Sequence, residues 1–392
     1  MVTCGDGLAI GADPERAVEF AVTEALLPLG GAAPDLACVF VSGLEPDAAG
    51  RALADAAEVI GANTVIGCSA DGVVGAGQAV EGQPAVSVWL AAAPDLRLRS
   101  FHLEVIRTDT AMTVVGMPEV GDATAGMLVV DPWTFPVDGF VSRSNETLPG
   151  LPLVGGAATG LSGPEGTRLL VDGTVFRRGA VGLLITGPAS VQALVSQGCR
   201  PVGPTMTVTA AEGNLLLGLA GRPALLKLRE VIAGLDHEDQ VRAAAGLQLG
   251  IAMDEYADER GPGDYLIRGL VGVDDSRSAV AVGDVVEVGH SVRFHVRDAE
   301  SASADLLGSL ARFRAQADLD AAGALLFSCT NRGEGMFGSA DHDVLTVRAG
   351  LGTRRVGGFF ANGEIGPVAG RNHVHAFTAS MLVLGSPPEA PA

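Results

Sequence analysis

The sequence of 392 residues has few aromatic side chains, a single lysine and no apolar run long enough to cross a bilayer. Aromatic residues make up 4%, and the mean hydropathy of +0.33 comes from short runs of alanine, valine and leucine. Met1 to Ile10 contain neither a basic segment nor a long apolar one, which argues against a secretory signal. Lys227, the only lysine, lies in a helix-like apolar segment, so lysine Schiff-base chemistry is not expected. We expect a cytoplasmic globular protein without membrane insertion.

A basic surface is also missing, because the net charge is −20 at pH 7. Binding to a nucleic-acid backbone requires a basic face, so we expect no nucleic-acid partner. Diffuse acidity of this kind usually serves solubility. The cysteines are odd in number, widely spaced and without a Cys-x-x-Cys pair, which excludes the usual thiolate zinc site and gives no disulfide framework. They are Cys4, Cys38, Cys68, Cys199 and Cys329.

Glycine, in contrast, is abundant, with 54 residues, and part of it follows a pattern. The pattern Gly-x-x-Ala-(Asp/Thr/Asn)-Gly occurs three times, at residues 67–72, 155–160 and 358–363. Glycine at both ends, with a small polar residue before the second, fits a turn with positive φ and a closely approached backbone. The approaching group can be a ligand or another strand.

Each copy of the pattern lies between apolar, strand-like runs, which for the first copy are residues 37–41 and 85–90. Because the flanks recur together with the core, we predict one supersecondary unit used repeatedly. The expected fold is α/β, with repeated strand-helix-strand-glycine-turn units that form mixed β-sheets flanked by helices. Strands joined across a helix are expected to be parallel, and closely connected strands antiparallel.

The length favours two lobes, since it exceeds one ordinary core. The polar and charged segment 234–240 is the expected boundary between them. In the last third, strand 324–329 leads through a loop and the segment 343–349 to the third glycine pattern. The helices expected from capping residues and apolar spacing are 13–27, 47–60, 223–233 and 298–314.

The densest polar cluster, Ser328 to Gly333, follows strand 324–329 where a glycine-rich loop begins. Ligand groups usually lie at this position in open α/β sheets. Arg332 can grip a carboxylate or a phosphate, or it can pair with Asp341 or Asp343. Glu364, held between glycines after the third pattern, can receive an amine or a guanidinium, or can cap a turn.

Two enzyme interpretations also remain open. His373 and His375 lie on one face of a predicted strand, and His-x-His is a metal-ligand spacing. The sequence offers no third ligand at a diagnostic spacing, so we expect no metal. Cys329 can act as a nucleophile with either histidine as base, although most such cysteines are packed and inert. A protein-interaction scaffold, in which the glycine patterns serve only strand packing, is the remaining alternative.

The last third resembles the C-terminal half of a FIST domain. The resemblance rests on Phe327-Ser328-Cys329, Asn331-Arg332-Gly333, the run from Gly357 to Pro367, His375 and Thr378. Weaker matches to the FIST N-terminal region are Ile66 to Ser69, Pro152 to Gly156 and Ser196 to Cys199. The resemblance implies a FIST N-terminal region at 15–233, a FIST C-terminal region at 241–385 and a disordered tail at 386–392.

The FIST family is regarded as an intracellular sensory module that binds small ligands such as amino acids. The resemblance therefore implies a stand-alone signal-transduction sensor rather than an enzyme, without a cofactor, that acts through a signalling protein partner. We expect the ligand mainly at the third pattern and regard the first two as architectural, apart from Ser69 and Asp71. The expected ligand-binding residues are Ser69, Asp71, Cys329, Asn331, Arg332, Gly333, Phe360, Asn362, Gly363, Glu364 and His375.

Overall fold

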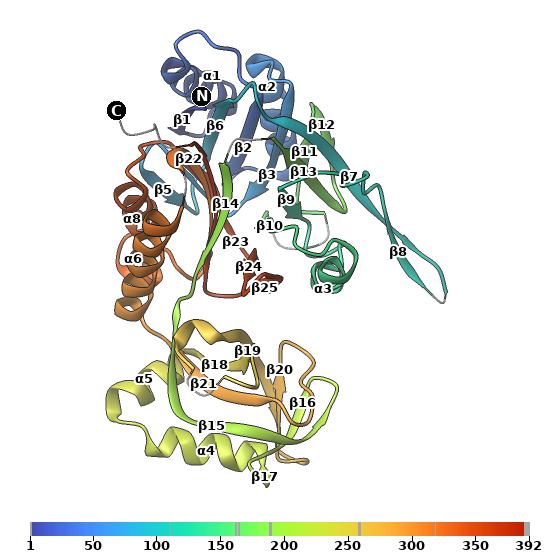
Figure 1. The fold of residues 1–392 in the computed structure, drawn as a ribbon, viewed down its shortest axis with the longest axis vertical. Helices are drawn as coiled ribbons and strands as arrows, with labels where there is room; N and C mark the ends of the chain where they lie inside the picture. Colours follow the sequence, from blue (N-terminus) through green and yellow to red (C-terminus); the bar gives the residue numbers. More distant parts are fainter. Residues whose placement is uncertain are drawn as a thin grey trace. The chain divides into compact units, whose positions relative to one another are not determined.

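A computed structural model describes residues 2–109, 111–160, 163, 165–187, 190–257, 260–317 and 319–387. The chain forms two compact units (Figure 1). Unit 1 comprises residues 1–195, 306–374 and 378–392, and unit 2 comprises residues 196–305 and 375–377. The segment 234–240, expected as the boundary, lies inside unit 2, where it joins α4 (Ala224–Gly234) to α5 (His237–Gly246). Of the expected tail, residues 388–392 lie outside the described residues.

The first repeat of unit 1 shows the predicted strand-helix-strand order. It consists of β2 (Leu36–Ser42), α2 (Pro46–Ile60), β3 (Thr64–Ala70) and β6 (Ala85–Ala92). Strands β2 and β3 are parallel, and β6 is antiparallel to β2. Every residue of β2 and β3 is buried, as expected for central strands that are covered on both faces. The left-handed Gly61 ends α2.

The other two repeats have the same order and the same pairing. The second consists of β9 (Ala125–Val130), α3 (Val137–Thr147), β10 (Leu153–Ala157) and β13 (Ala180–Thr186). The third consists of β22 (Asp320–Cys329), α7 (Glu334–Phe337), α8 (His342–Leu351), β23 (Val356–Ala361) and β26 (Ala379–Ser386). In both, the strands joined across helices are parallel and the last strand is antiparallel to the first.

The three glycine patterns mark the points where the chain leaves one sheet and enters another. After the first pattern, β4 (Gly72–Gly75) pairs with β23 of the third repeat. After the second, β11 (Leu169–Val171) pairs with β3 of the first. After the third, β24 (Glu364–Val368) pairs with β10 of the second. Each repeat therefore lends a strand to another, and the exchange closes in a cycle.

The first glycine of each pattern is required by this packing. A Cβ atom on Gly67, Gly155 or Gly358 would overlap a main-chain carbonyl oxygen of the parallel neighbouring strand. Two of the three also have a positive φ, 150° at Gly155 and 155° at Gly358. The pattern thus has an architectural role in all three copies, because only glycine lets the strands approach in this way.

The remaining elements of unit 1 extend the three sheets or cover them. The N-terminal helix α1 is capped by Asp13, whose carboxylate accepts a hydrogen bond of 3.3 Å from the Arg16 main-chain N–H. Helices α6 and α8 lie together on one side of the β22–β23 sheet (Figure 1). These elements are β1 (Thr3–Ile10), α1 (Pro14–Leu26), η1 (Leu27–Leu29), β5 (Gln78–Glu81), β7 (Arg97–Arg107), β8 (Met112–Val115), β12 (Thr174–Phe176), β14 (Ser190–Ser196), α6 (Ala299–Gln316) and β25 (Arg371–His375).

Unit 2 is built differently, from antiparallel strands that close on themselves. The order runs β15-β21-β18-β19-β20-β16, and β15 pairs again with β16. Helices α4 and α5 pack against its apolar core. Besides these helices, the unit contains β15 (Cys199–Glu212), β16 (Leu215–Leu219), β17 (Arg222–Pro223), β18 (Leu247–Ala252), η2 (Pro262–Asp264), β19 (Tyr265–Asp274), β20 (Ala279–Val282) and β21 (Ser291–Arg297).

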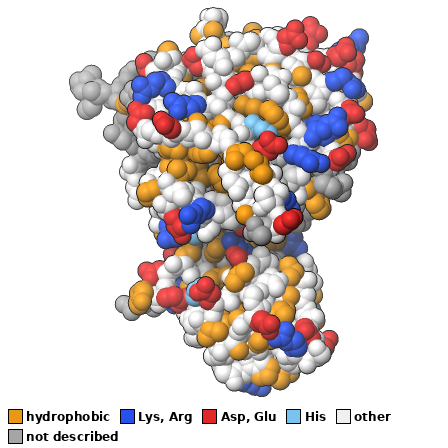
Figure 2. Space-filling model, turned by 90° about the vertical axis from the view of Figure 1, so that its right-hand side faces the viewer, with side chains coloured by type: hydrophobic (Ala, Val, Ile, Leu, Met, Phe, Trp, Pro, Cys, Tyr) orange, Lys and Arg blue, Asp and Glu red, His pale blue; other side chains and the backbone are white. Residues whose placement is uncertain are grey.

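The surface carries charges of both signs. Figure 2 shows basic side chains scattered among acidic ones on the face that it draws, rather than gathered into one patch. This distribution lacks the continuous basic stripe that a nucleic-acid backbone would need on that face. Within the described part of the chain, no helix is both long enough and apolar enough to cross a membrane.

Candidate functional site

The three glycine turns meet in unit 1 and are hydrogen-bonded to one another. The main-chain N–H of Asp71 donates to Oγ1 of Thr159 at 2.8 Å, and this hydroxyl donates to the carbonyl oxygen of Phe360 at 2.8 Å. The main-chain N–H of Asn362 donates to the carbonyl oxygen of Ala157 at 3.1 Å. The second turn therefore ties the first to the third. The prediction that function lies mainly at the third copy, with Ser69 and Asp71 as exceptions in the first, stays a prediction.

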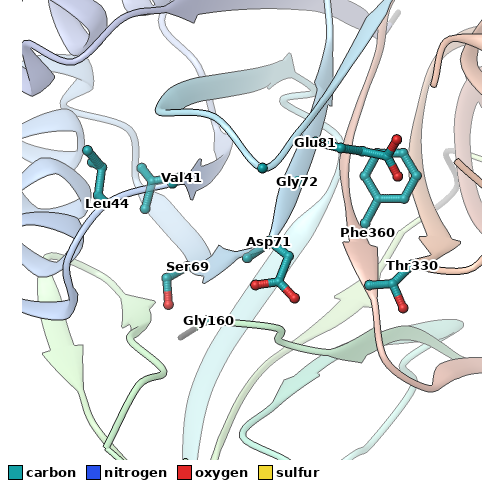
Figure 3. Close-up of a pocket in the computed structure, with 12 residues that line it drawn as sticks. Val41, Leu44, Ser69, Asp71, Gly72, Glu81, Gly160, Thr330 and Phe360 are labelled. Carbon is teal, nitrogen blue, oxygen red and sulfur yellow. The ribbon is translucent and has the colours of Figure 1, made fainter. Parts of the chain in front are cut away.

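Two adjoining cavities lie where the turns meet, and we call them together the three-turn site. Their volumes are about 390 and 310 Å³, and they share Asp71, Gly160 and Thr330. Figure 3 shows Asp71 between Ser69 on one side and Thr330 and Phe360 on the other. The first cavity is also lined by Val41, Gly43, Leu44, Ser69, Ala70, Gly72, Glu81, Gly82 and Phe360, and the second by Pro132, Trp133, Ala158, Thr159 and Asn362.

All three repeats contribute equivalent positions to this site. Asp71, Thr159 and Asn362 occupy the same place in the three glycine patterns, and all three line the second cavity. The residues just beyond the first parallel strand of each repeat also line the site, namely Gly43, Pro132 and Thr330. The site thus lies at the carboxyl ends of three parallel strand pairs, which is the usual ligand position in α/β sheets.

The lining combines apolar, neutral polar and acidic side chains. Val41, Leu44 and Phe360 supply apolar surface, while Asp71 and Glu81 supply carboxylates. Although Asp71 is exposed, partial desolvation of its carboxyl group raises the pKa above its ordinary value. Among the described residues that line the two cavities, none is a lysine or an arginine.

Gly333 contacts this lining through Glu81. The Glu81 carboxylate accepts a hydrogen bond of 2.9 Å from the main-chain N–H of Glu334, at the start of α7. A Cβ atom on Gly333 would overlap that carboxylate, so a larger residue there would displace the end of the Glu81 side chain. Gly333 therefore lies against the lining of the site rather than in it.

Arg332 is buried and paired with Asp343, one of the two alternatives that the sequence leaves open. Its Nε and Nη2 donate to the Asp343 carboxylate at 2.8 and 2.9 Å, and the side chain of Arg332 is 0% exposed. Ser328 Oγ donates to the same carboxylate at 2.7 Å, and Nδ1 of His342 lies 3.0 Å from it. Burial alone would raise the pKa of Asp343, but the Arg332 charge and these hydrogen bonds hold it well below its usual range.

Glu364 is buried next to this ion pair and receives several hydrogen bonds. The Thr378 main-chain N–H donates at 3.1 Å, the Thr378 hydroxyl at 2.8 Å and the Gly363 main-chain N–H at 3.3 Å. The Cys329 thiol is a further partner of the carboxylate. Burial raises the pKa of Glu364 to about 7, and these hydrogen bonds oppose the rise. Glu364 caps the turn, and it is not among the residues that line the three-turn site.

The remaining expected site residues are not among those that line the three-turn site. Asn331 is exposed, and its Nδ2 lies 3.9 Å from Sγ of the buried Cys329. Gly363 accepts a hydrogen bond of 2.9 Å from the Ala157 main-chain N–H through its carbonyl oxygen. His375 is buried and belongs to unit 2, whereas Arg332 and Glu364 belong to unit 1. The expected residues that line the three-turn site are Ser69, Asp71, Phe360 and Asn362.

Several lining residues were not expected from the sequence. Thr159 was available from the pattern itself, because it occupies the position of Asp71 and Asn362. Thr330 lies inside the polar cluster after strand 324–329, between the expected residues Cys329 and Asn331. Glu81 and Trp133 carry no signal in the sequence, since tertiary contacts alone bring them to the site.

Comparison with known proteins connects this geometry to a family. A model of the FIST N domain matches residues 35–222, and a model of the FIST C domain matches residues 224–367. This chain belongs to the FIST family. FIST domains are generally sensory domains thought to bind small ligands, and the family is not known as enzymatic. The lining residues up to Gly160 fall in the FIST N match, while Thr330, Phe360 and Asn362 fall in the FIST C match.

Relatives in mycobacteria share the whole FIST arrangement. An uncharacterised protein of Mycobacterium tuberculosis (strain ATCC 25618 / H37Rv) is 41% identical over 382 residues, covering 97% of this chain and 98% of the relative. An uncharacterised protein of Mycobacterium bovis (strain ATCC BAA-935 / AF2122/97) matches with the same identity and coverage. The similarity therefore extends over both FIST regions.

Proposed function

We propose that this protein is a small-ligand sensor whose binding site is the three-turn site of unit 1. The observation that carries the proposal is the convergence of Asp71, Thr159 and Asn362, three equivalent positions, on one cavity. Architecture accounts for the first glycine of each pattern and for the Thr159 hydroxyl, which joins the turns. Among the described contacts, none engages the side chain of Asp71 or Asn362, so their polarity at the fifth position is left for a ligand. Polar groups that converge on a concave surface are the usual mark of a ligand site.

The ligand is a small polar metabolite, of which an amino acid is the first example to test. Cavities of about 390 and 310 Å³ lie at the lower end of the range for small-molecule sites. Val41, Leu44 and Phe360 offer apolar contact, and Ser69, Thr330 and Asn362 offer hydrogen bonds. The ligand is thus expected to have both a carbon chain and a polar head.

Binding at this place can be communicated to a signalling partner through the sheets. The three turns come from three different sheets, and hydrogen bonds through Thr159 already join them. A ligand that bridges the turns would favour one arrangement of the sheets over others, and this differential affinity is the source of any signal. The partner is expected to read the surface of unit 1.

The alternatives have less support. Cys329 is buried, and Glu364 and Asn331 are among its partners. Packed cysteines of this kind are usually inert. No group of three or more His, Cys, Asp or Glu side chains in the described part of the chain is placed to hold a metal ion. The scaffold interpretation calls for a molecule without a polar-lined pocket, whereas polar residues line both cavities.

The test is a ligand screen combined with a blocking substitution. Amino acids and other small metabolites are screened by calorimetry and thermal shift against the wild type and Thr330→Tyr. Thr330 lines both cavities, so the larger tyrosine side chain should occupy the space of a ligand. We expect at least one ligand, and we expect Thr330→Tyr to abolish its binding. Thr23→Tyr, on the exposed face of α1, is the matched control and should bind normally. Full binding by Thr330→Tyr would place the ligand elsewhere, and no ligand in a broad screen would contradict the sensor function.

A further inference from the structure

We infer that the three-turn site selects a cationic ligand, a primary amine on a short apolar chain, rather than an anion or a neutral molecule. The inference rests on the proposed function and adds to it the sign of the ligand's charge, so an amine without a carboxylate is favoured over an amino acid. It follows from the carboxylates that line the two cavities and from the nearby arginines, which do not line them because they pair with other carboxylates.

Asp71 is the main reason. Its carboxylate belongs to the wall shared by the two cavities, so a ligand in either one meets it. Within the described residues, no ion pair or hydrogen bond engages this carboxylate, because the contacts of Asp71 with Thr159 and Gly82 are made by its main chain. Partial desolvation raises the pKa of Asp71, and a nearby ligand ammonium group would oppose that rise by favouring the charged carboxylate.

The arginines near the site do not balance this charge. Arg332, expected to receive a carboxylate, is buried and pairs with Asp343. Arg168 follows the second turn in the chain, but its Nη2 pairs with Asp47 at 2.9 Å and its Nη1 donates to main-chain carbonyl oxygens. A ligand carboxylate in the cavities would therefore face Asp71 and Glu81 without a described basic side chain among the lining residues.

The rest of the lining fits an alkyl ammonium ion. Val41, Leu44 and Phe360 offer apolar surface in the first cavity. Glu81, whose carboxylate accepts the Glu334 main-chain N–H, also lines this cavity. Trp133, which is 56% exposed, lines the second cavity together with Asp71. An indole attracts cations to its ring face, since the ring quadrupole is negative there.

The experiment compares three molecules that share a six-carbon chain and differ in the head group: hexylamine, hexan-1-ol and hexanoate. Their dissociation constants for the full chain are measured by calorimetry. Tryptophan fluorescence gives a second measure of binding. Trp133 lines the second cavity, whereas the only other tryptophan in the sequence, Trp89, is fully buried. We expect hexylamine to bind about tenfold or more tightly than hexan-1-ol, and hexanoate to bind most weakly.

Asp71→Asn identifies the carboxylate responsible. Asparagine occupies the equivalent position of the third turn, at Asn362, so the substitution preserves the turn. We expect it to remove most of the preference for the amine, a loss of about tenfold, while hexan-1-ol binds as before. Asp55→Asn changes the net charge equally on the exposed face of α2 and should leave all three affinities unchanged.

Each other outcome overturns the inference and separates it from the proposed function. Stronger binding of the alcohol or of hexanoate would leave a ligand site without cation selectivity. The same holds if the amine preference survives in Asp71→Asn, or if only neutral or anionic ligands emerge from the metabolite screen. If neither the three probes nor any metabolite binds, both the inference and the sensor function fail.

Discussion

Two carboxylates lie at glycine turns of the same pattern, one within the first turn and one directly after the third, and they differ in burial and in hydrogen bonding. Asp71, in the first turn, is exposed and lies in the wall shared by the two cavities. Glu364, directly after the third turn, is 0% exposed and receives hydrogen bonds from Thr378 and Gly363. The same repeated turn therefore places an acid in a cavity wall in one copy and is fixed by a buried acid in another.

The difference extends to the neighbouring charges. Around the third turn, Arg332 and Asp343 form a buried ion pair. Around the first turn, Asp71 and Glu81 face the cavities without a basic lining residue among those described. We therefore expect the third turn to contribute mainly to stability and the first turn to the recognition proposed above. This difference predicts that substitutions at the two places affect different measurements.

The largest expected effect is loss of stability when the buried ion pair is broken. Arg332→Ala leaves the Asp343 carboxylate buried without its partner, so we expect a decrease in the free energy of unfolding of about 3–5 kcal/mol. Urea unfolding followed by tryptophan fluorescence measures it, because Trp89 and Trp133 both lie in unit 1. The double variant Arg332→Met/Asp343→Leu should regain part of the loss. A change below about 1 kcal/mol in Arg332→Ala would mean that Arg332 does not support the fold.

The next effect is a pH dependence that belongs to Glu364. Its pKa is raised by burial from 4.5 to about 7 in the folded protein, so the folded state binds a proton more tightly than the unfolded state. Its contribution is fully present below pH 4.5 and is lost as the pH rises through about 7, a decrease on the order of 3 kcal/mol.

Glu364→Gln isolates this contribution, since glutamine can still accept the Thr378 hydrogen bonds but does not titrate. We expect the stability difference between pH 5 and pH 7.5 to be smaller in the variant than in the wild type. Asp343, whose pKa is lowered, titrates below this range in both proteins and does not interfere. Equal pH dependence in the two proteins would contradict the raised pKa.

A smaller loss is expected from the architectural glycines. In Gly67→Ala, the new methyl group would overlap the Val39 carbonyl oxygen on β2, and the two strands must move apart. We expect a destabilisation of about 1–3 kcal/mol in urea unfolding. Gly139→Ala is the matched control, because a Cβ there meets no atom and the residue lies within α3. The control should be neutral or slightly stabilising, and an equal loss in both variants would argue against the crowding at Gly67.

Much of the fold could be predicted from the sequence, because local patterns determine it. Capping residues and apolar spacing predicted the four helices that the structure shows at 14–26, 46–60, 224–234 and 299–316. The repeated glycine pattern predicted the repeated unit and the parallel pairing across its helices. The lobe boundary was not predictable in this way, since the chain enters unit 2 at Ser196 within β14 and leaves it within α6. The amino-acid composition does not change noticeably at either of these two positions in the chain.

The candidate site was predictable only in part. Asp71 and Asn362 were found because they belong to the pattern, whereas Glu81 and Trp133 reach the site through tertiary pairing that no local signal encodes. The ligand site was predicted at the third copy because polar residues are densest in the sequence near it. Density does not distinguish a buried, internally satisfied cluster such as Arg332–Asp343 from an open one, since burial depends on neighbours distant in the chain.

The smallest expected effect tests the aromatic wall of the recognition side. Trp133 is 56% exposed, so Trp133→Leu should change the free energy of unfolding by no more than about 0.5 kcal/mol. Loss of the indole face should weaken hexylamine binding by about two- to fivefold, because a cation gains about 0.5–1 kcal/mol over an exposed ring. Calorimetry is the appropriate readout, since the fluorescent reporter is removed. Trp133→Phe retains a ring and should lose less. If leucine weakens hexan-1-ol as strongly as hexylamine, Trp133 supplies only apolar contact, and the selectivity for cations rests on Asp71 and Glu81.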